Sequence, residues 1–388
     1  MLENALQGSR KYWAWIGFLL VLILGGAIAY FFQMRDGLSV TGLSRDVSWG
    51  FYISQFTFLV GVAASAVMVV LPYYLHNYKA FGKMVVMGEL LAIPAVFMCM
   101  LFIVVDMGQP SRVANVFLHP SPSSMMFWDT VALMGYLLLN VLISQITFGA
   151  ERRGVAPPKW IKPVIILSIP WAVSIHTVTA FLYAGLEARS FWMTAILAPR
   201  FLASAFASGP SLLIILCLLV KKFTKFDPGK QAIQKLAQIV TYALAINVFF
   251  VAVELFSGIY SDMPHHKHAF EYLFFGLNHG EFSALVPFMW TSQILALGAL
   301  LLLLFPKIRA KESALALICP AVIVAIWIEK GMGMIVTGFI PSPTGQVTEY
   351  APTLIEGGVT IGVYAIGILI LTVLYKIAVS VREGIAGK

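Results

Sequence analysis

A few ionisable side chains embedded in long apolar stretches are the residues of this sequence best suited to chemistry. His176 is the only histidine well inside such a stretch, and Glu89, Glu254 and the pair Glu329–Lys330 are likewise surrounded by hydrophobic residues. An ionisable group within hydrocarbon costs about 2.5 to 3.5 kcal/mol on insertion scales. Each group therefore has either a role in proton transfer or a partner on a neighbouring helix, and the sequence leaves both interpretations open.

A proton path is one function that these side chains could share. Histidine takes up and releases protons near neutral pH, which suits a general acid–base role for His176. Asp106 and Asp129 border one loop, at the predicted depth of His176 and Glu254, whereas Glu89 lies toward the opposite side. The pattern predicts that His176, Asp106, Glu254 and Glu89 take part in proton transfer.

A polar face on another stretch predicts a binding site for a quinone. Tyr52 and Gln55 recur at helical spacing just after Trp49, and His176 and Thr177 are predicted at the same depth. A cleft lined by aromatic and apolar side chains suits the quinone ring, whose two carbonyls need donors able to deliver protons. The alternative is that these polar residues only join helices to one another.

The elements that must position these side chains are ten stretches of roughly twenty mostly apolar residues, each long enough to cross a bilayer as a helix. They span 13–32, 49–75, 84–105, 127–147, 160–185, 200–220, 233–261, 281–304, 313–336 and 357–379. With 60% hydrophobic and 11% charged residues, the chain could not hide its apolar surface in one soluble core. We predict an all-α integral membrane protein, with residues 1–388 in a single membrane domain.

Basic residues in the connecting loops predict the orientation of the spans. Of the 26 Lys and Arg residues, 19 fall on one side of the layout, and the remaining 7 fall on the other side or at its helix ends. The positive-inside rule then places both termini, including Lys388, in the cytoplasm. The net charge of +8 is therefore a topology signal, and nucleic-acid binding has no support.

A weak internal repeat predicts how the spans are grouped. Asp106-Met107 ends the third span and Asp262-Met263 ends the seventh, and the span that follows each of them begins near a tryptophan. An offset of four spans preserves orientation. We expect two parallel four-helix bundles, spans 2–5 over 49–185 and spans 6–9 over 200–336, flanked by helices at 13–32 and 357–379.

Histidine and cysteine positions argue against bound metal in this chain. A transmembrane haem of the b type needs two histidines on facing helices, and His176 stands alone inside its span. The other candidate ligands are three clustered histidines without a nearby cysteine and three dispersed cysteines: His265, His266, His268, Cys99, Cys217 and Cys319. We expect no metal site, haem or iron–sulfur cluster in this chain.

The outer loops differ in composition from the short basic loops on the cytoplasmic side. Gly, Pro, His and acidic residues concentrate at 106–126, 262–280 and 338–356. Such loops are typical of ordered segments folded back over helix ends. We therefore expect them to dock a partner protein.

Several long motifs resemble the NrfD/PsrC family, the membrane subunits of polysulfide reductase and related respiratory complexes. The resemblance covers spans 2 to 9. The motifs are Trp49-Gly50 with Gly61, DMGQPSR at 106–112, MMFWD at 125–129 and the run from SIHTVTAFLYAG to ASAFASGP at 174–210. Within the family, 257–276 and 338–356 are most similar to the ten-span membrane subunit of the dissimilatory sulfite-reductase-associated complex, or to its relative in the high-molecular-weight cytochrome complex.

The resemblance implies a location in the prokaryotic cytoplasmic (inner) membrane and a site for menaquinone or ubiquinone near the outer face. It also implies a ferredoxin-like iron–sulfur partner on the outer loops, with further cytochrome or membrane subunits, so that the chain is not catalytic alone. The family's quinone site corresponds here to Tyr52, Gln55 and His176. Trp49, Thr177 and Arg112 complete the predicted contacts, although the His and Asn pattern of the polysulfide enzymes is absent.

Two other functions are compatible with ten spans. A secondary transporter predicts broken helices around a site at the membrane midplane. A structural anchor for partner proteins predicts that no quinone binds and that the intramembrane acids are dispensable. The direction of electron flow is left open by the sequence.

Overall fold

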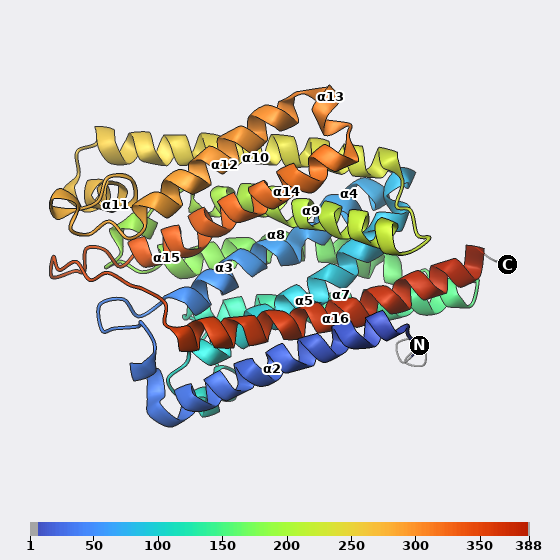
Figure 1. Cartoon of the computed structure of the whole chain (residues 1–388), viewed down its shortest axis with the longest axis horizontal. Helices are drawn as coiled ribbons and strands as arrows, with labels where there is room; N and C mark the ends of the chain where they lie inside the picture. The colour runs from blue at the N-terminus through green and yellow to red at the C-terminus, as the bar shows by residue number, and fades with distance from the viewer. Residues whose placement is uncertain (1–6, 387–388) are drawn as a thin grey trace.

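Ten long helical segments make up the part of the chain that the structure describes. The computed structural model describes residues 7–386 (Figure 1), with no β-strand in that range. The segments long and apolar enough to cross a membrane are Arg10–Val40, Phe51–Tyr74, Lys79–Asp106, Met125–Arg152, Ile161–Ala184, Leu197–Phe223, Lys230–Tyr260, Val286–Leu304, Glu312–Thr337 and Leu354–Val381. The predicted all-α membrane fold with ten spans is confirmed.

Most helices are longer than the predicted apolar runs. The sequence predicts the fourth span over 127–147, whereas its helix α7 covers Met125–Arg152, 28 residues. At about 1.5 Å per residue this helix is about 42 Å long, which matches a bilayer including its headgroup layers. The eighth span begins later than expected, at Val286, because 276–285 forms a compact turn in which Gly276 and Gly280 have positive φ.

Two spans are interrupted within the membrane. The second consists of α3 (Phe51–Ala63), a 3₁₀ turn and α4 (Val67–Tyr74). The ninth consists of α14 (Glu312–Ile326), the π-helical turn η7 (Trp327–Gly333) and α15 (Met334–Thr337). Inside η7, Gly331 has non-helical backbone angles, φ −80° and ψ −105°. Apolar periodicity did not predict either interruption, and π turns occur frequently at functional sites.

Spans two to nine pack in two groups. In the first group, α3 contacts α5 (Gly82–Asp106), α5 contacts α7, and α7 contacts α8 (Ile161–Ala184), which also contacts α4. In the second group, α9 (Leu197–Phe223) contacts α10 (Lys230–Tyr260) and α14, and α12 (Val286–Leu304) contacts α10 and α14. Helix α3 also contacts α9 and η7, joining the groups. The division into two parallel four-helix bundles stays a prediction.

Helices α2 (Arg10–Asp36) and α16 (Leu354–Ala386) pair with each other at the edge of the molecule. They meet where Gly26 faces Gly362, and a methyl group on either residue would overlap the backbone of the other. Such close approach through small residues is a common basis of helix association in membranes. Only 11% of the apolar stretch of the first span is buried, so most of its surface is not covered by the rest of this chain.

Both described ends of the chain lie at the same end of the helices (Figure 1), where Lys376 donates a hydrogen bond to the carbonyl of Gln7. The loops at 107–124, 261–285 and 338–353 lie at the opposite end, which we call the loop end. A chain with an even number of spans must have both of its ends on the same side of the membrane. Lys388, on which part of the orientation argument rests, lies outside the described residues.

The basic bias predicts which end faces the cytoplasm. A reporter that is active only outside the cytoplasm should give no signal when fused after Lys388, and a strong signal when inserted in the loop at 338–353. The same insertion in the loop at 224–229, which is at the other end, is the matched control and should be silent. The opposite pattern of signals would invert the orientation.

Candidate functional site

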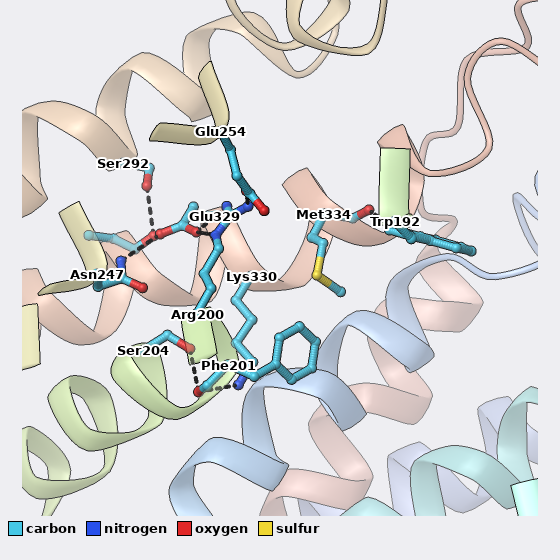
Figure 2. Close-up of polar contacts among 11 residues, drawn as sticks. Trp192, Arg200, Phe201, Ser204, Asn247, Glu254, Ser292, Glu329, Lys330 and Met334 are labelled. Atoms are coloured by element: carbon cyan, nitrogen blue, oxygen red, sulfur yellow. Dashed lines mark hydrogen bonds and ion pairs between the residues drawn. The ribbon is translucent and has the colours of Figure 1, made fainter. Parts of the chain in front are cut away.

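Three charged side chains are buried together where α9, α10 and η7 meet (Figure 2). Arg200 Nε and Nη2 donate to Glu329 Oε1 at 3.1 and 2.5 Å, and Arg200 Nη1 donates to Glu254. Asn247 Nδ2 donates to Glu329 Oε2 at 3.0 Å. All four residues are at most 9% exposed. We call Arg200, Asn247, Glu254 and Glu329 the ion-pair cluster. Its single guanidinium group balances the charge of only one of the two carboxylates.

Lys330 follows Glu329 directly but contacts different neighbours (Figure 2). Its Nζ lies 3.4 Å from the carbonyl oxygen of Phe201 and 4.2 Å from the centre of the Phe201 ring. The same ammonium lies against α3, where a Cβ on Gly61 would be 3.5 Å from it. The side chain is 3% exposed. A cation is thus held between the two helix groups by a carbonyl oxygen and an aromatic face.

His176 is a buried polar group inside the first helix group. It is fully buried on α8, and its Nδ1 lies 3.1 Å from the carbonyl oxygen of Ala172. A carbonyl partner assigns the ring proton to Nδ1, so Nε2 carries the lone pair. Nε2 has no hydrogen-bond partner among the described residues. The imidazole therefore has a free acceptor.

Two short hydrogen bonds lie on the helices around His176. Thr179, one turn further along α8, donates to the buried Asp129 of α7 at 2.6 Å. Thr57 of α3 and Tyr183 of α8 share a hydrogen bond of 2.6 Å. The first helix group thus contains polar contacts that join α7 to α8 and α3 to α8.

Tyr52 and Gln55, the predicted quinone contacts on α3, are bound to other helices. Tyr52 donates to Gln33 of α2 at 2.6 Å. Gln55 Oε1 accepts hydrogen bonds of 2.8 Å from Trp327 of η7 and Tyr364 of α16, while its Nε2 has no partner in the described part of the chain. Neither residue is hydrogen-bonded to His176. The cleft that the sequence placed between them stays a prediction.

Trp49 belongs to an aromatic cluster that closes the loop end of the first helix group. Its ring stacks on Trp192 at 5.9 Å and meets Tyr183 and Phe339 edge to face at 5.8 and 5.9 Å. Trp192 Nε1 donates a hydrogen bond of 2.9 Å to the carbonyl oxygen of Met334, which connects the aromatic cluster to α15. These rings offer the stacking surface that a quinone needs.

A set of hydrogen bonds around Tyr350 and Glu356 joins the loop end to the start of α3. The hydroxyl of Tyr350 donates to Glu356 at 2.5 Å and accepts from the backbone N–H of Phe51, at the start of α3. Glu356 also accepts from the backbone N–H groups of Gly42 and Thr353, both at 2.8 Å. Burial, followed by the Glu356 carboxylate, raises the pKa of Tyr350. The phenol therefore stays protonated and keeps three segments of the loop end together.

The other predicted site residues form no hydrogen bond with His176 in the described part of the chain. Thr177 bonds to the carbonyl of Val173 on its own helix, and Arg112 is exposed on the loop after α5. Asp106, at the end of α5, has a buried Oδ1 without a partner among residues 7–386. Each of these roles stays a prediction.

Glu89 lies at the other end of the molecule, on α5. It is 3% exposed and lines an open cavity of about 1070 Å³, together with Lys79, Lys83 and Lys225. Glu89 is thus far from the loop end, and its role in proton transfer stays a prediction. Within the described residues, no three His, Cys, Asp or Glu side chains form a group that could hold a metal ion.

Sequence reasoning missed Arg200, Asn247 and Glu356. The positive-inside count treats Arg200 only as a charge at a helix end, although it lies inside an apolar helix, opposite spans that each carry a buried acid. A search for one basic residue to balance Glu254 and Glu329 could have found it. Nothing in the sequence pattern indicated that Asn247 or Glu356 would join these contacts.

Comparisons with known proteins agree with this architecture. The family described as "Polysulphide reductase, NrfD" matches residues 39–340. The chain is 27% identical to a Halobacterium salinarum protein named as a membrane subunit of dimethyl sulfoxide reductase, over 92% of this chain and 89% of that protein. It is 23% identical to a selenate reductase subunit of Mesobacillus selenatarsenatis, over 94% and 93% of the two chains. It is also 23% identical to the Hdr-like menaquinol oxidoreductase integral membrane subunit of Archaeoglobus fulgidus, over 68% and 65%.

Removing the guanidinium of the ion-pair cluster should destabilise the protein. Arg200→Met leaves two buried carboxylates without their direct partner, a change that costs about 3–5 kcal/mol in buried ion pairs. A thiol-reactive dye can follow thermal unfolding, because Cys99, Cys217 and Cys319 are all buried in the folded protein.

Arg45→Met, at an exposed position, is the matched control and should change the stability by less than about 0.5 kcal/mol. Equal unfolding curves for the two variants would show that the cluster adds no net stability.

Proposed function

The chain belongs to the NrfD family, and we propose that it is the quinone-binding membrane subunit of a respiratory redox complex. In this proposal it exchanges electrons and protons between menaquinone or ubiquinone and an iron–sulfur partner on the loop end. The names of its relatives as subunits of reductases and of a menaquinol oxidoreductase support a role in a multi-subunit redox complex. The particular resemblance to the sulfite-reductase-associated complex stays a prediction of the sequence.

The observation that carries the proposal is the buried, unpaired Nε2 of His176. A buried polar atom without a partner is costly, and native structures retain such atoms where a ligand or a reaction uses them. In our proposal Nε2 accepts the hydroxyl proton of a quinol, or returns it to a quinone carbonyl. The unpaired Nε2 of Gln55 adds a donor, and the rings of Trp49 and Trp192 add a stacking surface.

Quinol oxidation releases two electrons and two protons, so the site needs a route for protons as well as an electron acceptor. We propose that Asp106 and Glu254 carry protons at the loop end and that Glu89 carries them at the other end. Support comes from the unpaired Asp106 Oδ1 and Glu254 Oε1, and from the cavity that opens beside Glu89. The two electrons leave to clusters on the partner.

The loop end has the ordered surface that docking needs. The loop before α7 is fixed by a hydrogen bond from Trp128 Nε1 to the Pro122 carbonyl, and α11 (Pro264–Phe274) is fixed by a hydrogen bond from Trp290 Nε1 to the Phe274 carbonyl. Lys267 pairs with Asp262 at 2.7 Å, which lowers the pKa of that exposed carboxyl and keeps it charged. Rigid loops lose little entropy on binding a partner.

Secondary transport is the second candidate function. The interruptions of the second and ninth spans favour it, because transporters bind their substrates at broken helices. Proteoliposomes that contain this chain alone distinguish the two functions. Transport predicts solute uptake without partner subunits, whereas the quinone function predicts turnover only in the assembled complex.

Replacing His176 should impair chemistry more than assembly. One interhelical hydrogen bond in a membrane protein is worth about 0.6 kcal/mol on average, whereas loss of a general acid–base group costs on the order of a hundredfold in rate or more. His176→Ala should therefore assemble with its partners while quinone-coupled turnover of the purified complex falls about a hundredfold.

Ser168→Ala is the matched control on the same helix, since its hydroxyl bonds to the Ile165 carbonyl one turn away. Unimpaired turnover in an assembled His176→Ala complex would remove His176 from the mechanism and leave helix packing as its role. Extraction of the purified complex should also yield bound quinone, and a complex free of quinone would favour the structural-anchor function.

Cross-linking should locate the iron–sulfur partner at the loop end. A photo-reactive residue placed at Ser123, Asn278 or Thr344, all on loops at that end, should capture the partner. The same group at Lys225, at the opposite end, should not. Capture from position 225 alone would place electron entry on the other side of the membrane.

A further inference from the structure

Helix α3 carries four buried polar side chains, and three of them have already used their hydroxyl protons. Ser54 and Thr57 donate to backbone carbonyls of their own helix at 2.8 and 2.7 Å. Tyr52 donates to Gln33 of α2 at 2.6 Å. The fourth, Gln55, is 1% exposed and keeps an amide nitrogen without a partner in the described part of the chain. Among these four side chains, Gln55 is therefore the one with hydrogen-bond donors to offer a ligand.

The neighbours of Tyr52 fix the direction of its hydrogen bond. Gln33 Nε2 lies 2.6 Å from the carbonyl oxygen of Val105, near the end of α5, and a carbonyl can only accept. The amide oxygen of Gln33 must then face Tyr52, so the phenol has to donate to it. Tyr52 keeps only lone pairs, which a ligand carbonyl cannot use. A donor toward a ligand carbonyl on this helix therefore has to come from Gln55.

Two donors hold the amide of Gln55 in one orientation. The indole N–H of Trp327, on η7, can only donate, and its nitrogen lies 2.8 Å from Gln55 Oε1. The hydroxyl of Tyr364, on α16, donates to the same oxygen at 2.8 Å. Turning the amide over would place its NH2 group against both donors and lose both hydrogen bonds. The amide oxygen is thus fixed, and the NH2 group is the part of the side chain that is left for a ligand.

Helix α16 is anchored on both sides of Tyr364. Two residues before it, Gly362 packs against the backbone of α2. About three turns after it, Tyr375 donates to the Met87 carbonyl of α5 at 2.7 Å. The ring of Phe102, also on α5, meets the Tyr364 ring edge to face at 5.7 Å. The hydroxyl of Tyr364 is therefore presented to Gln55 by a helix with little freedom to shift or rotate.

Tyr364 lies outside residues 39–340, the segment that matches the NrfD family, and so does Gln33. Two helices beyond that segment thus bind the polar face of α3: α2 through Gln33 and α16 through Tyr364. The contacts of Gln55 in this chain consequently include one that the matched segment alone does not supply.

We propose that Tyr364 is a positioning residue for the quinone: together with Trp327 it holds the Gln55 amide so that its NH2 group donates to a quinone carbonyl. This proposal rests on the proposed quinone function. A buried N–H group without a partner is costly, and a ligand carbonyl removes that cost. An amide already fixed at its oxygen does not have to be ordered when the ligand binds, which favours affinity.

Tyr364→Phe removes one hydroxyl and keeps the ring. The quinone KM of the assembled complex should rise about fivefold, the scale of one hydrogen bond, while kcat stays close to the wild-type value because Tyr364 does not touch the reacting atoms. Tyr375→Phe is the matched control, since it removes a hydroxyl of the same helix that bonds to α5, and it should leave the quinone KM unchanged. Equal effects of the two variants on KM would reduce Tyr364 to helix packing.

A double-mutant cycle tests whether Tyr364 acts through Gln55. Gln55→Met removes the donor and should raise the quinone KM about tenfold. In that background Tyr364→Phe should have no further effect, because no amide is left to orient. A helix-packing role predicts instead that the two effects add, and additive effects would overturn the proposal.

Infrared spectra of bound quinone give a readout that does not depend on turnover. A hydrogen bond from an amide lowers the stretching frequency of a carbonyl. With a quinone isotope-labelled at its ring carbonyls, the labelled band should therefore move up in Gln55→Met and in Tyr364→Phe, but not in Tyr375→Phe. A band that moves in Gln55→Met alone would keep the donor and overturn the role of Tyr364.

The same spectra separate this role from the quinone function itself. A band unchanged in both Gln55→Met and Tyr364→Phe, with quinone still bound, would overturn the contact at Gln55 and leave the quinone function standing. A wild-type complex that binds no labelled quinone would overturn the quinone function.

Discussion

The rest of the membrane interior depends on the neutralisation of buried charge. Arg200 binds two carboxylates that come from different spans, so α9, α10 and η7 cannot separate without exposing a charge to hydrocarbon. Hydrophobic burial gives lipid-embedded helices little reason to choose one neighbour over another, because lipid is as apolar as a leucine side chain. The ion pairs determine which elements become neighbours, and they fix the depth in the membrane at which α9, α10 and η7 meet.

The unusual backbone of the ninth span follows from the same constraint. A regular helix through 327–333 would direct its side chains along one continuous spiral, whereas this segment meets Gln55 through Trp327, Arg200 through Glu329 and Phe201 through Lys330. Glycine at 331 permits the local departure from helical angles. The wider turn thus serves the contacts of both helix groups, and its cost is offset by the hydrogen bonds that it allows.

Some features of this structure leave a direct pattern in the amino-acid sequence, and others do not. Hydrophobic length and composition predicted the ten spans, because the bilayer imposes them on the sequence directly. The burial of His176, Glu89, Glu254 and Glu329 was also readable, since ionisable groups within apolar runs are conspicuous. The sequence did not predict which side chains pair with one another. Arg200 resembled an ordinary interfacial charge. Gln55 binds Trp327 and Tyr364, which are 272 and 309 residues away. Contacts between distant helices depend on rotation about the helix axes, which apolar periodicity determines weakly when almost every face is hydrophobic.

The Gly26–Gly362 contact has a consequence for biosynthesis. The two residues are 336 positions apart (362 − 26), so the first span leaves the ribosome long before its partner exists. At ~5–20 residues per second this interval is on the order of tens of seconds. During that time the glycine face of α2 is covered only by lipid or by an insertion factor. Completion of the last span then closes the edge of the molecule, and a chain truncated before α16 would have a first helix that is still unpaired.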